Sequence, residues 1–207
     1  MAKQEYDHLI FFGGSFDPPH LAHLEMVRIL KKDYLSKTKI LIVPNYQSPF
    51  KDQKSLLRED ILLLCKWNFA SILDENTELS SLEISKKEKS YTVETLEELK
   101  SNYSQTKISL CMGEDSILTL PTWFQYDRIN QLVSSYLIFR RHTPSPVEIK
   151  FPNNSIRNKS KVYDNPLWDI SSTMIRNKRK LSLAKIHLEE KVLGRLVEIG
   201  WFSEDNE

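Results

Sequence analysis

The chain has 207 residues and a mass of 24.3 kDa, which is long enough to bury a sizeable hydrophobic core. Its hydrophobic fraction of 40% and charged fraction of 28% are typical of globular proteins, which argues against a disordered chain. The formal net charge of +1 excludes a strongly basic nucleic-acid-binding protein, but it leaves room for a small phosphorylated ligand that needs only a few local cations.

Short apolar runs alternate with amphipathic segments along the chain. The apolar runs predict strands at 9–12, 40–43, 82–84, 108–112 and 136–139, with one more near Val162 in the otherwise irregular stretch 142–166. Apolar residues at helical spacing and capping signals predict helices at 21–32, 56–69, 92–102 (with Thr92 as N-cap), from Ser171 onward, and at 189–199.

This alternation predicts a Rossmann-like, doubly wound α/β fold with a mainly parallel sheet. We expect a single domain over 1–207, in which 170–207 forms a C-terminal helical part. Ligands of such folds bind where the strands end and the strand order reverses, so the loops after the strands are the places to look for chemistry.

The two cysteines, Cys65 and Cys111, follow apolar residues and are predicted to be buried core thiols. Their spacing is not that of a metal-ligand pair. No apolar run approaches the roughly 20 residues that a membrane-spanning helix needs, and 9–12 is too short for the core of a signal peptide. We therefore expect a cytoplasmic protein with neither a membrane nor a nucleic acid as partner. The oligomeric state, a homo-oligomer included, is left open.

The loop after the first predicted strand carries the clearest chemical signal. Residues 13–23 read GGSFDPPHLAH, in which two glycines allow a tight turn and a close approach to a ligand. His20 and His23 are three residues apart, so both rings lie on one face of the first helical turn. Two imidazoles at a helix N-terminus suit phosphate oxygens, because free amides and the helix dipole already favour an anion there.

This segment resembles the N-terminal signature of the nucleotidyltransferase α/β-phosphodiesterase superfamily, whose members carry an H-x-G-H motif. In its fuller form it is more similar to bacterial nicotinate-nucleotide adenylyltransferases than to other branches. The resemblance implies catalytic roles for His20 and His23. Ala22 stands where that family has glycine. Contacts to ATP are implied for Gly13, Gly14, Ser15, Phe16 and Ala22.

Later segments resemble the same family in the same order. In 44–51 the family's closing lysine is kept as Lys51, while Phe50 replaces its usual histidine. Three further segments resemble motifs of the family. Residues 90–92 match its Ser-Tyr-Thr motif, 113–115 match its Gly-x-Asp motif after a strand, and 123–124 match its aromatic pair. The resemblance assigns to the nicotinate mononucleotide site Lys51, Ser90, Tyr91, Thr92, Gly113, Asp115, Trp123 and Phe124.

A second strong motif lies at 170–176, which reads ISSTMIR. Hydroxyl residues at a helix start can bind an anion, and an arginine one turn later can fork onto phosphate oxygens. By resemblance, Ser171, Ser172 and Thr173 hold the ATP phosphates, Arg176 is catalytic, and Arg141 approaches the nucleotide.

The reaction implied by the resemblance is adenylyl transfer from ATP to nicotinate mononucleotide, which yields deamido-NAD and pyrophosphate for NAD biosynthesis. Mg²⁺ is expected to arrive with the ATP, and no metal site of the protein's own is expected. Three alternatives stay open: nicotinamide mononucleotide as the acceptor, another nucleotidyltransferase of the superfamily, and a non-catalytic nucleotide-binding protein on the same fold.

Overall fold

The computed structural model describes residues 6–34, 37–49 and 54–202. Its centre is one sheet of six strands in the order β3-β2-β1-β4-β5-β6, and every described strand pair is parallel. The strands are β1 (His8–Gly14), β2 (Thr38–Pro44), β3 (Thr77–Leu79), β4 (Lys107–Gly113), β5 (Ser135–Phe139) and β6 (Ser160–Tyr163). The doubly wound α/β fold predicted from the sequence is confirmed.

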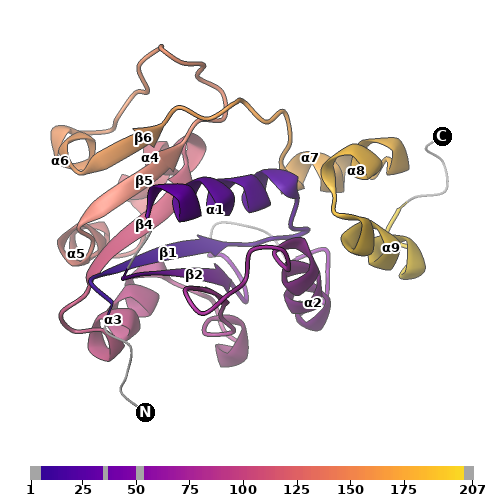
Figure 1. Cartoon of the computed structure of the whole chain (residues 1–207), viewed down its shortest axis with the longest axis horizontal. Helices are drawn as coiled ribbons and strands as arrows, with labels where there is room; N and C mark the ends of the chain where they lie inside the picture. The colour runs from indigo at the N-terminus through magenta and orange to yellow at the C-terminus, as the bar shows by residue number, and fades with distance from the viewer. Residues whose placement is uncertain (1–5, 35–36, 50–53, 203–207) are drawn as a thin grey trace.

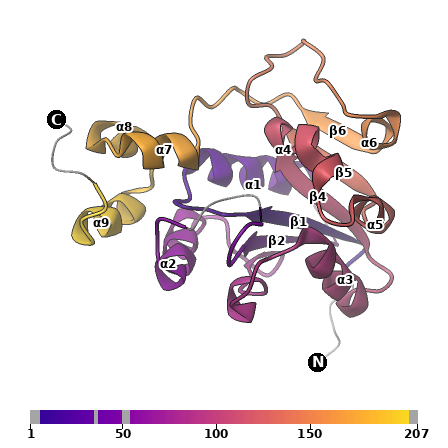
Figure 2. The same cartoon turned by 180° about the vertical axis from the view of Figure 1, so that it is seen from behind.

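Helices cover both faces of this sheet and continue beyond one end of it (Figure 1). The α-helices of the described residues are α1 (Leu21–Asp33), α2 (Arg58–Asn68), α3 (Thr92–Asn102), α4 (Glu114–Thr119), α5 (Tyr126–Leu132), α6 (Asn154–Asn158), α7 (Ser172–Lys178), α8 (Leu181–His187) and α9 (Glu190–Glu198). Two short 3₁₀ turns cover Ile84–Lys86 and Leu120–Thr122. Figure 2 shows α3, α4 and α5 from the opposite side, away from the C-terminal group α7–α9.

Alternate residues of the strands feed two hydrophobic cores. Leu9 and Phe11 of β1 pack with α3, α4 and α5, whereas Ile10 and Phe12 pack with α1, α2 and the C-terminal helices. This is the period-two alternation of a strand, with an apolar layer on each side. The strands therefore read as continuous apolar runs, which is why the sequence revealed them.

The two cysteines are free and buried, as predicted, and burial raises the pKa of each thiol. Among the described residues, no helix has the length and apolar character to cross a membrane.

The structure differs from the sequence prediction in three respects. The strand expected at 82–84 is wrong: the edge strand is Thr77–Leu79, and Glu83 has helical backbone angles, with its buried carboxylate accepting a hydrogen bond from Thr95 Oγ1 at 2.7 Å. The cap of α3 falls on Tyr91, so that Thr92 is the first helical residue. Short α4, α5 and α6 were not foreseen, because helices of five to seven residues show too little periodicity.

Leu64 tests the packing of α2 against the sheet. Its side chain is fully buried in the first core, so Leu64→Ala should lower the free energy of unfolding by about 2–5 kcal/mol, through lost burial and the cavity left behind. Leu57 just before α2 is 67% exposed, so Leu57→Ala should change stability by less than about 0.5 kcal/mol. Urea unfolding curves measure both; equal losses would contradict the assigned packing.

Candidate active site

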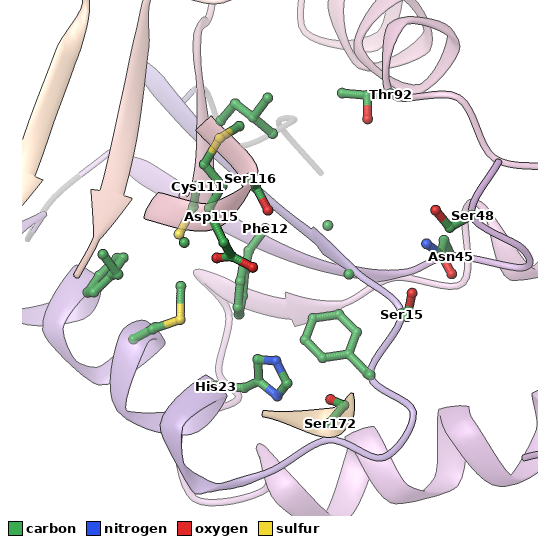
Figure 3. Close-up of a pocket in the computed structure, with 18 of the residues that line it drawn as sticks. Phe12, Ser15, His23, Asn45, Ser48, Thr92, Cys111, Asp115, Ser116 and Ser172 are labelled. Carbon is green, nitrogen blue, oxygen red and sulfur yellow. The ribbon is translucent and has the colours of Figure 1, made fainter. Parts of the chain in front are cut away.

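A cleft of about 630 Å³ opens at the carboxyl ends of β1, β4 and β5. The connection after β1 leads to one side of the sheet and that after β4 to the other, so their loops diverge and leave space between them. Figure 3 shows His23 and Ser172 at one end of this cleft and Thr92 at the other. The cleft therefore combines loops that are far apart in the sequence.

Most of the site residues predicted from the sequence line this one cleft. They are Gly13, Gly14, Ser15, Phe16, His20, Ala22, His23, Ser90, Tyr91, Thr92, Gly113, Asp115, Trp123, Phe124, Arg141, Ser171, Ser172 and Thr173. Lys51 and Phe50 lie outside the described residues. Arg176 does not line the cleft but stands immediately behind it.

His20 and His23 form a stacked pair at the start of α1. Their ring centroids are 3.7 Å apart with an interplanar angle of 23°. The backbone N–H of His20 donates to Nδ1 of His23 at 3.2 Å, which assigns the ring proton of neutral His23 to Nε2. His23 is thereby prepared to donate a hydrogen bond from Nε2.

The His20 ring is buried, and neither of its nitrogens has a hydrogen-bond partner among the residues that the structure describes. Burial, followed by the charges of Arg141 and His187, lowers the pKa of His20 to about 3. A buried polar ring without partners costs stability, and an anionic ligand in the cleft would supply the missing acceptor. This orphaned imidazole is the best physical sign that the cleft is built for a ligand.

Helix α7 closes the same end of the cleft. Ser171 caps the helix by accepting the Met174 N–H at 3.0 Å, and Ser172 Oγ donates to the Pro18 carbonyl at 2.9 Å. Arg176 donates to the Asp17 carbonyl at 2.6 Å and to Thr173 Oγ1 at 2.9 Å. These bonds join α7 to the loop after β1, so the two motifs recognised in the sequence form one surface.

The opposite end of the cleft is more apolar. The Trp123 ring borders it, with Nε1 3.4 Å from Thr119 Oγ1, and the rings of Tyr91 and Phe124 pack at 4.9 Å. Ser90 Oγ accepts the Tyr46 N–H at 3.1 Å and so ties the start of α3 to the loop after β2. An aromatic wall beside a helix N-terminus suits a flat ring that carries an anionic group.

Several residues of the site were missed from the sequence. Glu83 and Ser116 line the cleft, and the Glu114 carboxylate accepts hydrogen bonds from the loop after β5. Burial raises the pKa of Glu83. Lys54 donates to the Ser15 carbonyl at 3.0 Å and to the Asn45 carbonyl, and burial lowers its pKa to about 8. A lone glutamate or lysine in a polar segment carries no sequence signal of such burial.

A parallel α/β sheet with paired imidazoles and a helix N-terminus around a cleft at its switch point defines a nucleotide-binding protein. Residues 11–178 match the model of the cytidylyltransferase-like family. The chain is 32% identical over 185 residues to a probable nicotinate-nucleotide adenylyltransferase of Leptospira interrogans, covering 88% of this chain and 90% of that protein. It is 33% identical to the protein of the same description from Fusobacterium nucleatum, covering 92% and 96%.

The chain therefore belongs to the cytidylyltransferase-like family of nucleotidyltransferases, among the nicotinate-nucleotide adenylyltransferases. The fold is also that of the nicotinic acid mononucleotide adenylyltransferase of Plasmodium falciparum in complex with NaAD. That structure superposes with a TM-score of 0.73 at 20% identity and covers 94% of this chain and 96% of that one.

His20 makes the stability of the ligand-free protein depend on pH. The unfolded chain takes up a proton at this histidine near pH 6.5, whereas the native ring stays neutral down to about pH 3. Between these values the unfolded state binds more protons, so stability falls as the pH falls. By pH 5 the loss due to His20 is about 2 kcal/mol.

We expect urea unfolding at pH 7 and pH 5 to show this loss in the wild type and not in His20→Asn. The matched control is His142→Asn, since His142 is exposed and should keep the wild-type pH dependence. An unchanged pH dependence in His20→Asn would contradict the assignment.

Proposed function

We propose that this protein transfers the adenylyl group of ATP to nicotinate mononucleotide, forming deamido-NAD and pyrophosphate. The observation that carries the proposal is a single cleft with two dissimilar ends. One end presents two imidazoles and the hydroxyls of α7, and the other presents Trp123 beside the start of α3. Relatives of about this length that are described as nicotinate-nucleotide adenylyltransferases support the same assignment.

In the proposed reaction an oxygen of the acceptor 5′-phosphate forms a bond to the α-phosphorus of ATP. The bond between that phosphorus and the bridging oxygen breaks, and the electron pair leaves with pyrophosphate. The protein contributes position and charge stabilisation, because both reacting groups come from the substrates. His23 would donate from Nε2 to a phosphate oxygen, and His20 would gain in that phosphate an acceptor that the described part of the chain does not give it.

Binding of the ATP phosphates is assigned to Ser171, Ser172 and Thr173, with the glycine loop 13–16 beneath them. Arg176 is proposed to act from behind this surface. Its two hydrogen bonds, to the Asp17 carbonyl and to Thr173, hold the motifs together, and we assign to its charge the stabilisation of phosphate oxygens. Ala22, at the second position of α1, is buried in the first core and also lines the cleft.

Nicotinate recognition is proposed for the other end of the cleft. Ser90, Tyr91 and Thr92 would present hydroxyls and backbone amides to the ring carboxylate, and Trp123 would stack on the electron-poor pyridine. Asp115 lies between the two ends (Figure 3), where ribose hydroxyls would need an acceptor, and Gly113 lines the same cleft. Lys51 and the backbone of Phe124 complete the proposed acceptor site.

Mg²⁺ is proposed to enter with ATP. The described residues contain no group of three or more histidine, cysteine, aspartate or glutamate side chains arranged to hold a metal ion. Asp17, the acidic residue of the phosphate-binding loop, uses its carboxylate to accept from Ser55 at 2.9 Å and 2.7 Å. When bound to the phosphates and water, the ion would neutralise triphosphate charge. We also propose that residues 1–207 form a single nucleotidyltransferase domain.

His23 provides the first test. His23→Ala should reduce kcat by at least about 100-fold, because it removes a donor from the phosphate-binding surface. The far-ultraviolet circular dichroism and the urea midpoint should stay close to the wild type, since the ring borders a cleft. Release of pyrophosphate in a coupled assay measures turnover. Normal turnover by a folded His23→Ala protein would refute the mechanism.

The acceptor is tested in the same assay with ATP and either nicotinate or nicotinamide mononucleotide. We expect nicotinate mononucleotide to have the higher kcat/KM, because a helix N-terminus and hydroxyl donors favour a carboxylate over an amide. A higher value with the amide would reassign the acceptor. Binding of ATP without turnover of either acceptor would favour a non-catalytic nucleotide-binding protein.

A further inference from the structure

Glu114 at the start of α4 is buried and yet does not line the cleft. Its carboxylate accepts hydrogen bonds from three successive backbone amides of the loop after β5. Oε2 accepts from the Arg141 N–H at 3.1 Å, and Oε1 accepts from the His142 N–H at 2.9 Å and the Thr143 N–H at 3.0 Å. The Thr143 hydroxyl adds a fourth bond to Oε1 at 3.1 Å.

Three consecutive amides that converge on one anion form a nest, a concave backbone arrangement that binds negative charge. Here the anion is a side chain of the protein. The bonds are charge-assisted and shielded from water, so each contributes more than a surface hydrogen bond does. Glu114 therefore binds the amide side of the loop at 141–143, while the Arg140 guanidinium donates to the Thr143 carbonyl at 3.0 Å.

The same loop carries Arg141 into the cleft. Its guanidinium donates from Nη2 to the Ile170 carbonyl at 3.0 Å, and Nη1 lies 3.9 Å from Asp115 Oδ1. Its aliphatic stem packs against Gly113. A Cβ atom added to Gly113 would lie only 2.8 Å from Arg141 Cδ, so a larger residue at this position would collide with the arginine. Arg141 thus connects the end of β4 with Ile170, the residue before Ser171. Its positive charge also helps to lower the pKa of His20.

We infer that Glu114 is a positioning residue for the ATP site, which holds Arg141 where its guanidinium meets the triphosphate. The inference rests on the proposed function for its substrate, but its geometry is independent of the acceptor. Loss of Glu114 would leave three amides without an acceptor and free the loop, and Arg141 would lose the backbone anchor that directs its side chain.

A double-mutant cycle on ATP binding tests this inference. Glu114→Ala should weaken ATP binding about tenfold in calorimetry, and the KM for ATP should rise in parallel. The KM for the acceptor should rise less than the KM for ATP, because Arg141 meets Asp115 of the proposed acceptor site only at 3.9 Å and the Glu114 bonds do not reach the aromatic end of the cleft. In an Arg141→Ala background the further change Glu114→Ala should cost little, since Glu114 acts through Arg141.

Glu148→Gln is the matched control. Glu148 pairs with Arg157 on the exposed surface of the stretch after the same loop, so its loss should leave ATP binding unchanged. Should Glu114→Ala fail to fold, Glu114→Gln carries the cycle. It keeps one carbonyl acceptor but turns an NH₂ group toward amide donors, and it should show a smaller loss in the same direction.

Rescue by a small anion gives a second readout. Sodium formate should restore part of the ATP affinity of Glu114→Ala by occupying the empty nest. Sodium chloride at equal ionic strength should not restore it, and formate should not raise the ATP affinity of Arg141→Ala. Additive losses in the cycle, an equal rise in the KM of the acceptor, or unchanged ATP binding would each overturn the inference. If the wild type binds ATP without turnover, the proposed reaction is wrong. The double-mutant cycle on ATP binding then still tests the positioning role of Glu114.

Discussion

The parallel sheet imposes the constraint on which the rest of this molecule depends. Since every described strand runs the same way, all the strands deliver their following loops to one edge, and the loops after β1 and β4 turn to opposite sides. The cleft is the space that this divergence leaves. Residues as distant in the chain as Ser15 and Ser172 meet there without any long-range sequence signal between them.

Electrostatics within the cleft follow from burial more than from composition. A chain with a net charge of +1 has no surplus of cations, and its anion-binding capacity is local. Buried His20 is held neutral, Arg141 is directed into the cleft, and the start of α7 presents hydroxyls. The neutral imidazole and the hydroxyls can bind a polyanion beside Arg141 without the mutual repulsion that a cluster of buried cations would suffer.

Three carboxylates near the cleft accept hydrogen bonds from within the protein. Asp17 holds Ser55, Glu83 holds Thr95, and Glu114 holds the loop at 141–143. These three carboxylates fix the loops around the cleft. Arg176 is bound in the same manner, because its guanidinium is committed to a main-chain carbonyl of the loop after β1.

Sequence alone was sufficient for the fold class and for most of the cleft. Buried strands read as apolar runs, and the loop 13–23 and the segment 170–176 carry residue patterns that few structures other than anion sites require. The tertiary structure decided the remainder. The edge strand is only three residues long, and Glu83 in the predicted strand 82–84 is captured by Thr95, a contact between segments that no local pattern records.

Glu114 shows the same division most clearly. In the sequence it is one more acidic residue after a predicted strand, in a segment for which no helix was predicted. Only the fold brings it against three amides that lie 27 to 29 residues further along the chain. Local propensity and periodicity act over a few residues, whereas the partners of a buried charge are chosen by the packing of the whole sheet.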